Sequence, residues 1–195
     1  MARARHRKPD WDRLFEVASA QEGLFATAQA AEAGYSPQLL QKHLRAGRVS
    51  RVRRGVYRLV HFPPGEHEDL AAVWLWTERA GVFSQETALS LLGLSDALPA
   101  QVHVTVPASW QHRRLRVPSG VSLAFADVAA PERAWVGAVP VTSARRTLAD
   151  CAAAGVSPDL VAAAVQQVRA RGLVASTELP RLPRRRRAAA ARRTR

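Results

Sequence analysis

Hydrophobic positions in the first 46 residues recur at helical spacing in three short segments. Residues 11–20 place apolar side chains at positions i, i+3, i+4 and i+7, which is typical of a helix lying on a core. Residues 25–33 are rich in alanine and end before a glycine, so they predict a second helix. A third helix is expected over residues 36–46, because Ser36 is a good N-cap and Pro37 fits the first helical position.

The pattern becomes that of strands after residue 48. Residues 49–60 place valine, tyrosine and leucine around Arg53-Arg54-Gly55, which predicts a two-stranded ribbon with its turn at the glycine. The alternation of apolar and polar residues is imperfect, so it does not fix the register. Pro63 and Pro64 can continue neither a helix nor a strand and therefore mark the expected end of the first unit.

A second unit of mixed helices and strands is expected after this linker. Helical spacing extends over residues 66–80, 84–92, 143–154 and 158–171, and strand-like alternation over residues 101–106, 121–125 and 138–141. The predicted fold class is therefore α+β. Because the prolines lie outside both apolar patterns, we expect each unit to have its own core and to fold by itself.

Composition divides the chain into four parts. We expect folded domains over residues 11–62 and 66–179, flanked by disordered basic segments over residues 1–10 and 180–195. No stretch approaches the ~18 consecutive apolar residues of a membrane span, and the first residues do not resemble a signal peptide. The single cysteine, Cys151, cannot form an internal disulfide. These features predict a protein of the reducing cytoplasm, without contact to a membrane.

The net charge of +13 is concentrated in three blocks. Residues 1–8, 36–58 and 181–195 carry +4, +7 and +8 without an acid, while the rest of the chain is net negative. Only the middle block lies on a predicted folded element. Helix, glycine turn, capped helix and basic ribbon follow one another as in a winged helix-turn-helix, whose second helix lies in the major groove. The expected partner is double-stranded DNA.

Two groups of side chains are candidates for contacting this DNA. One group recurs at i, i+3, i+4 and i+7 on the third helix and has the residue types that pair with adenine and guanine edges. The other group consists of ribbon arginines suited to phosphates or a narrow minor groove. The full predicted DNA-binding set is Ser36, Gln38, Gln41, Lys42, Arg45, Arg48, Arg51, Arg53, Arg54 and Arg58. A solvated basic face and a protein-docking module without DNA binding are the alternative interpretations.

Several short runs resemble one protein family along most of the chain. They are Gly23-Leu24-Phe25, Ala30, Gly34 and residues 51–57, followed by residues 83–88, 92–94, 102–107 and 141–150. In this order they are similar to AbiEi-type antitoxins of type IV toxin–antitoxin systems, over about residues 11–179. The resemblance implies a bacterial antitoxin that represses its own promoter through the winged helix. It also implies that the second domain opposes a nucleotidyltransferase toxin without a stable complex, and it assigns no neutralising residues.

The same arrangement also resembles the front of longer proteins that end in a Vsr-like endonuclease domain. After Glu178 the sequence contains no acidic residue, so the paired carboxylates that would hold Mg²⁺ are missing. We therefore predict no catalytic residue, no metal site and no cofactor. A DNA-binding regulatory remnant of such a nuclease system stays open as the alternative function.

Candidate metal and nucleophile sites have simpler explanations. His61 and His67 lie near Glu66, Glu68 and Asp69, but their spacing matches no zinc pattern, and we interpret the acids as helix-start residues. Cys151 has no histidine nearby in the sequence and is predicted to be a buried structural thiol.

Two further features concern the second unit. Trp74 and Trp76 are two positions apart on a helix and cannot both face inward, so one is expected at a surface. Arg146 and Asp150 are spaced i, i+4 and predict an ordinary helix-surface ion pair, with binding of a partner as the alternative.

Overall fold

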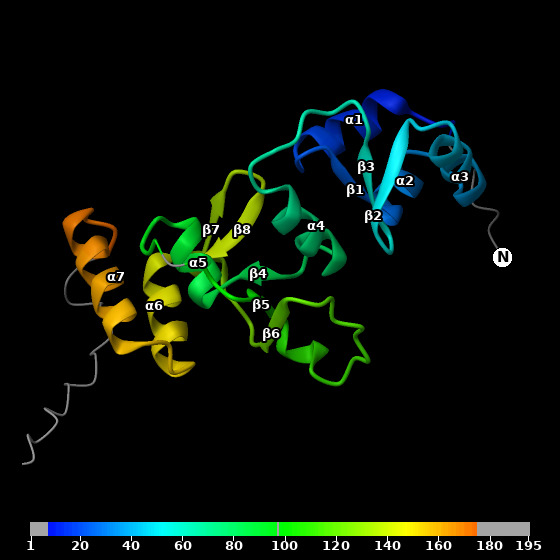
Figure 1. Ribbon diagram of the computed structural model, residues 1–195. Coiled ribbons are helices and arrows are strands. Elements are labelled where there is room, and N and C mark those ends of the chain that lie inside the picture. The colour runs from blue at the N-terminus through cyan, green and yellow to red at the C-terminus, as the bar shows by residue number, and fades with distance from the viewer. Residues whose placement is uncertain (1–7, 97, 175–195) are drawn as a thin grey trace, which may run out of the picture.

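The computed structural model describes residues 8–96 and 98–174 and has the predicted α+β architecture. A winged-helix unit packs beside a second unit built on a mixed sheet, and α6 and α7 lie at the end far from the winged helix (Figure 1). Residues 1–7, the predicted tail over 180–195 and residues 175–179 of the second predicted domain lie outside the described residues. In the described part, no helix has the length and apolar character needed to cross a membrane.

The first unit contains the three predicted helices and the predicted ribbon. They are α1 (Trp11–Ser19), α2 (Thr27–Glu32), α3 (Pro37–Arg45), β2 (Val49–Arg53) and β3 (Val56–Leu59). Asp10 caps α1 by accepting a hydrogen bond from the Arg13 amide, and Ser36 caps α3 by accepting one from the Leu39 amide. Gly55 closes the ribbon turn with φ of +79°, a conformation that glycine adopts without a Cβ clash.

A third strand, β1 (Leu24–Ala26), corrects the prediction that a helix begins at residue 25. It pairs antiparallel with β3 and gives the strand order β1-β3-β2. Because neighbouring residues of a strand point to opposite faces, Phe25 enters the core of the first unit while Leu24 faces the second unit. This three-residue strand is defined by its pairing with β3, a contact between distant parts of the chain. The local alanine-rich pattern therefore could not predict it.

The second unit is built on a five-stranded mixed sheet in the order β6-β5-β4-β8-β7. Its strands are β4 (Val82–Phe83), β5 (Val102–Val106), β6 (Val121–Phe125), β7 (Arg133–Val136) and β8 (Val139–Thr142), and its helices are α4 (Glu68–Trp76), α5 (Gln85–Leu91), α6 (Ala144–Ala153) and α7 (Pro158–Ala170), with 3₁₀ turns η1 (Ala108–Trp110) and η2 (Ala130–Glu132). The sequence predicted neither β4, which is too short to alternate, nor β7, which is defined by pairing with β8. Helix α4 also ends before the predicted residue 80, since Glu78 and Arg79 have φ of 54° and 66°.

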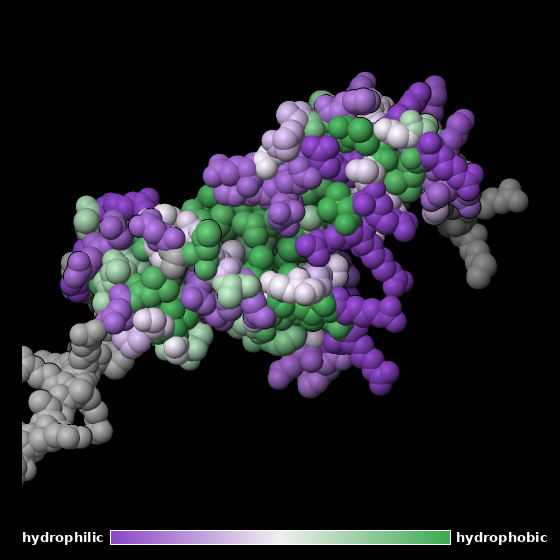
Figure 2. All heavy atoms as spheres, viewed as in Figure 1, coloured by the Kyte–Doolittle hydropathy of each residue, from purple (hydrophilic) through white to green (hydrophobic). Residues whose placement is uncertain are grey.

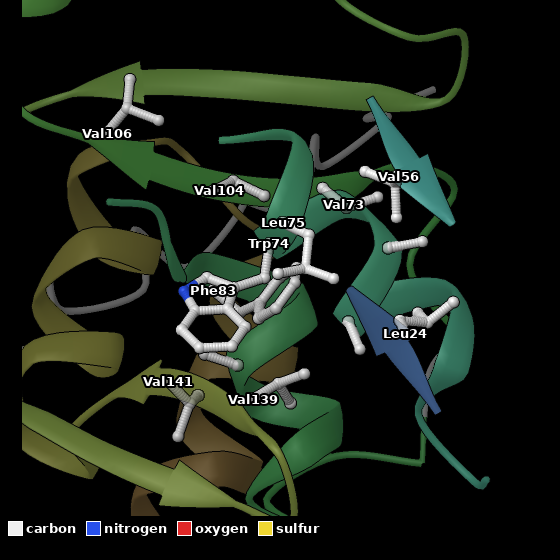
Figure 3. Close-up of a cluster of buried hydrophobic side chains, with 13 residues drawn as sticks. Leu24, Val56, Val73, Trp74, Leu75, Phe83, Val104, Val106, Val139 and Val141 are labelled. Carbon is white, nitrogen blue, oxygen red and sulfur yellow. The ribbon is translucent and has the colours of Figure 1, made fainter. Parts of the chain in front are cut away.

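One hydrophobic cluster joins the two units across the proline linker. Leu24 of β1 and Val56 of β3 pack in the same cluster as Val73 and Leu75 of α4 and Phe83 of β4. Figure 3 shows β1 and β3 directing their side chains toward α4, with the sheet valines around the other side of that helix. The first unit keeps a core of its own around Leu14, Phe25 and Tyr57, as predicted. The sequence pattern did not predict the additional cluster in which both units cover α4. Independent folding of each unit stays a prediction.

A smaller cluster packs α5, α6 and α7 together around Leu148 and Cys151. The cysteine is fully buried, which confirms the structural role predicted for it. Burial raises the pKa of the Cys151 thiol to about 12, so the thiol stays protonated and unreactive at neutral pH.

Candidate nucleic-acid interface

Helix α3 presents its predicted polar face to solvent. Gln38, Gln41, Lys42 and Arg45 are all exposed, and none of them forms an ion pair with another residue of the described chain. The opposite face holds the buried Leu40, with Leu39 and Leu44 half-buried against the same core. The helix therefore offers two amides and two cations along one side, available for contacts outside the protein.

Aromatic contacts fasten the inner side of α3 to the rest of the unit. The His43 ring stacks on Trp11 of α1 at a centroid distance of 5.7 Å and meets the edge of Tyr35 at 5.5 Å. Burial lowers the pKa of His43, and the nearby positive charges of Arg48 and Lys42 lower it further. A neutral imidazole therefore holds the helix that presents the polar face.

The β2–β3 ribbon forms the wing and carries three arginines near its turn. Arg51 and Arg54 are exposed and Arg53 is half-buried. The pairing register of β2 with β3 shifts between Arg51 and Arg53. The Arg51 guanidinium donates a hydrogen bond to the Tyr57 hydroxyl at 3.2 Å and lies 5.6 Å from the centre of that ring. The exposed Arg48 lies between α3 and β2, so the cations of the helix and of the wing belong to neighbouring elements.

Arg58 differs from the other arginines of the predicted set. Its Nε lies 2.9 Å from Glu68 of α4, and its other nitrogens donate to the carbonyl oxygens of Leu59, Val60 and Phe62. These four acceptors occupy the guanidinium, and its side chain is only 17% exposed. Arg58 therefore connects the wing to α4, and we leave it out of the interface.

The connection between β5 and β6 is a second basic segment, which the charge blocks of the sequence did not predict. Residues 107–120 contain Arg113, Arg114 and Arg116 and no acid, and all three arginines are exposed. Three arginines within four residues are a local sign of a basic surface. The net charge of the surrounding sequence is negative, so a sum over the second unit does not reveal this segment. Its nearness to the wing is a tertiary feature that no local pattern contains (Figure 1).

The remaining candidates have structural roles. Glu68 and Asp69 lie in the first turn of α4, as predicted, and the described residues contain no group of three or more histidine, cysteine or acidic side chains that could hold a metal ion. The predicted pair of Arg146 with Asp150 is present at 2.8 Å, and Arg146 also contacts Glu132 at 2.7 Å. A backbone hydrogen bond from Ala129 is the main cause that lowers the pKa of Glu132.

The tryptophans of α4 divide as expected. Trp74 is buried in the shared core and meets the exposed Trp135 edge-on, with ring centroids 5.5 Å apart. Trp76 is half-buried, and its surface lines the groove next to the wing.

Comparison with known proteins gives a family match within the first unit. Residues 12–60 match the family described as transcriptional regulator, AbiEi antitoxin, which confirms the resemblance over that segment. Among solved structures, the crystal structure of the RV2827C protein from Mycobacterium tuberculosis is similar, with 18% sequence identity and a TM-score of 0.42, over 84% of this chain and 73% of that chain. No curated protein matches the sequence.

Proposed function

Because residues 12–60 match the family of AbiEi antitoxin transcriptional regulators, we propose that this protein represses its own promoter and acts as the antitoxin of a type IV system. The observation that carries the DNA-binding part is the exposed polar stripe of α3 beside the arginines of the wing. A basic surface on a helix and its neighbouring ribbon is the electrostatic footprint expected for a duplex partner.

In this proposal α3 lies in the major groove and reads bases. Gln38 and Gln41 have the amide groups that pair with adenine N6 and N7, while Lys42 and Arg45 can donate to guanine O6 and N7. The wing arginines Arg51, Arg53 and Arg54, together with Arg48 and the cap residue Ser36, contact phosphates and fix the register on the duplex.

The second unit supplies the antitoxin activity in this proposal. It opposes a nucleotidyltransferase toxin encoded by a neighbouring gene, without a stable complex between the two proteins. We propose no catalytic step, no cofactor and a cytoplasmic location. The regulatory description of the family that residues 12–60 match supports a role without catalysis, and the protonated thiol of Cys151 agrees with it.

A gel shift with the full chain tests DNA binding. The affinity of the chain for a duplex from its own upstream region should exceed its affinity for a scrambled duplex of the same length and composition by roughly a thousandfold or more. This factor is the lower end of typical specificity ratios. Equal affinity for both duplexes would mean that the chain binds DNA only by electrostatic attraction, without sequence preference. Absence of binding would favour the protein-docking alternative.

Co-expression tests the antitoxin part separately. The full chain should restore growth to cells that express the neighbouring nucleotidyltransferase, whereas an unrelated arginine-rich protein should not. A chain that binds its operator but has no toxin-like neighbour, or gives no protection, would instead be the DNA-binding remnant of a nuclease system.

A further inference from the structure

A groove separates the tip of the wing from the loop over residues 107–120. It has a volume of about 620 Å³. Arg53 and Arg54 line it from the wing, Arg114 and Arg116 line it from the loop, and the rings of Trp76 and Trp110 contribute apolar surface. Figure 2 shows hydrophilic side chains projecting on both sides of this part of the molecule. Two segments far apart in the sequence therefore bring four arginines to one groove.

The positive charge of the groove is largely uncompensated. Glu78 is the acidic residue among its lining side chains, and Glu78 already pairs with Arg113 at 3.1 Å. Within the described chain, none of the four lining arginines forms an ion pair. Placing four guanidinium groups around one open groove is electrostatically unfavourable unless anions enter it.

The loop holds its arginines in a defined place. Backbone hydrogen bonds join Trp110 to Pro107, Arg113 to Trp110 and Leu115 to Arg113, while the Ala108 amide donates to the Asp127 carboxylate at 3.2 Å. The loop also follows β5 and precedes β6, which pair in parallel along five residues. These restraints present the arginines beside the wing instead of leaving them on a freely moving chain.

The chemistry of the groove favours phosphates over bases. The Arg113 guanidinium lies 4.0 Å from the centre of the Trp110 ring, so one face of that ring is already covered and cannot stack on a base. The planar guanidinium groups that remain match phosphate oxygens, with two parallel hydrogen bonds each. The exposure of Arg114 and Arg116 suits an extended backbone passing through, because an enclosed ligand would require walls on all sides.

We propose that this groove binds the sugar-phosphate backbone of the DNA duplex, so that the 107–120 loop of the second unit is a second phosphate-contacting element. The inference rests on the proposed DNA-binding function and extends it to a part of the chain outside the matched segment. Phosphates held here lie beyond those contacted by α3. The second unit then adds affinity without adding base recognition.

The experiment compares salt dependence of DNA binding by full-length variants. Replacing Arg114→Ala and Arg116→Ala should reduce the slope of log K against log salt concentration by about 1.8, since each lost phosphate contact is worth about 0.9. Preference for the upstream duplex over a scrambled duplex should stay unchanged. The matched control, Arg145→Ala with Arg169→Ala, removes two exposed arginines from α6 and α7 at the far end of the molecule and should leave the slope unchanged (Figure 1).

Two further variants separate the possible outcomes. Arg114→Lys with Arg116→Lys keeps the charge and should keep most of the slope, and equal thermal midpoints for all variants exclude unfolding as the cause. If Arg53→Ala with Arg54→Ala lowers the slope but the Arg114/Arg116 alanine variant does not, the wing binds DNA and the loop does not. That result overturns the inference about the groove and leaves the proposed function standing. If the unmodified chain binds no duplex, the proposed function fails and the inference fails with it.

Phosphate ethylation interference gives a second readout on the same duplex. The unmodified chain should be sensitive to ethylation at phosphates outside the region contacted by α3. The Arg114/Arg116 alanine variant should lose sensitivity at those phosphates and retain it elsewhere. An identical interference pattern for the two proteins contradicts the proposal.

Discussion

His43 of α3 stacks on Trp11 of α1, with ring centroids 5.7 Å apart and an angle of 24° between the ring planes. The helix that carries the candidate base-reading residues is therefore held by a titratable aromatic side chain from its own inner face. Burial lowers the pKa of that imidazole, and Arg48 and Lys42 lower it further, so the stacked form is the neutral one.

This contact predicts a loss of stability in mild acid. Because the folded-state pKa of His43 is lowered, the unfolded chain binds more protons once the pH falls below its ordinary value near 6.5. The contribution of His43 is fully present above that pH and is lost as the pH falls toward the folded-state pKa. The free energy of unfolding, measured with urea, should be lower at pH 5 than at pH 7.5. His43→Phe keeps an aromatic ring without the titration and should lose less stability between the same two pH values; an equal loss in both proteins would rule out His43 as the cause.

The exposed face of α3 predicts a separation between specific and non-specific binding. Gln41→Ala or Lys42→Ala should each weaken binding to the upstream duplex by about 1–3 kcal/mol if the side chain makes a bidentate contact to a base. Binding to a scrambled duplex should change little, or, for Lys42, only through the lost charge. Competition gel shifts measure both affinities, and equal weakening on the two duplexes would assign these residues to phosphates.

Arg58 should behave as a structural residue. Arg58→Ala removes the contact to Glu68 and the hydrogen bonds to three backbone carbonyls, and should lower the free energy of unfolding by about 2 kcal/mol. The exposed Arg54→Ala should stay within about 0.5 kcal/mol of the unmodified protein. A double-mutant cycle with Glu68→Ala should give a coupling of about 1 kcal/mol. A coupling of zero would mean that solvent screens the pair completely.

Cys151 predicts a thiol that reacts only when the protein opens. With its pKa near 12, the folded thiol has roughly a thousandfold less thiolate at pH 8 than an unfolded cysteine with an ordinary pKa. Alkylation by iodoacetamide, followed by mass spectrometry, should therefore be at least that much slower without urea than with it. Rapid alkylation of the folded protein would show that the α5–α6–α7 cluster opens easily.

Local signals explain which parts of the molecule the sequence predicts well. The Ser36-Pro37 start of α3 and the glycine turn of the wing depend on the conformations of a few neighbouring residues, and both are found where expected. Strand β1 and the groove beside the wing depend on pairing and on packing between distant segments, which periodicity does not encode. Arg58 belongs to the same class, because its type and spacing fit the wing but its partner Glu68 lies on another element.

The shared core predicts that the two units unfold together. Helix α4 has five consecutive buried residues, from Ala71 to Leu75, so neighbours must cover it on all sides. Leu24 of β1 is one of these neighbours and is fully buried. Leu24→Ala should lower the free energy of unfolding by about 3 kcal/mol, and tryptophan fluorescence and circular dichroism should report one common transition. Leu98→Ala is the matched control, since its side chain is 90% exposed and its loss should change stability by less than about 0.5 kcal/mol.

The same packing predicts the behaviour of a truncated chain. Removing residues 1–62 takes away Leu24 and Val56 and leaves one side of α4 without cover. This truncated chain should bind a hydrophobic dye and melt at a temperature well below that of the full-length protein. The reason is that the apolar surface covered by β1 and β3 in the full-length protein would face water. Adding a polar side chain at the uncovered face, as in Leu75→Gln, should reduce dye binding by the truncated chain while destabilising the full-length protein. A truncated chain that melts at the full-length temperature without binding dye would mean that β1 and β3 contribute nothing to the stability of the second unit.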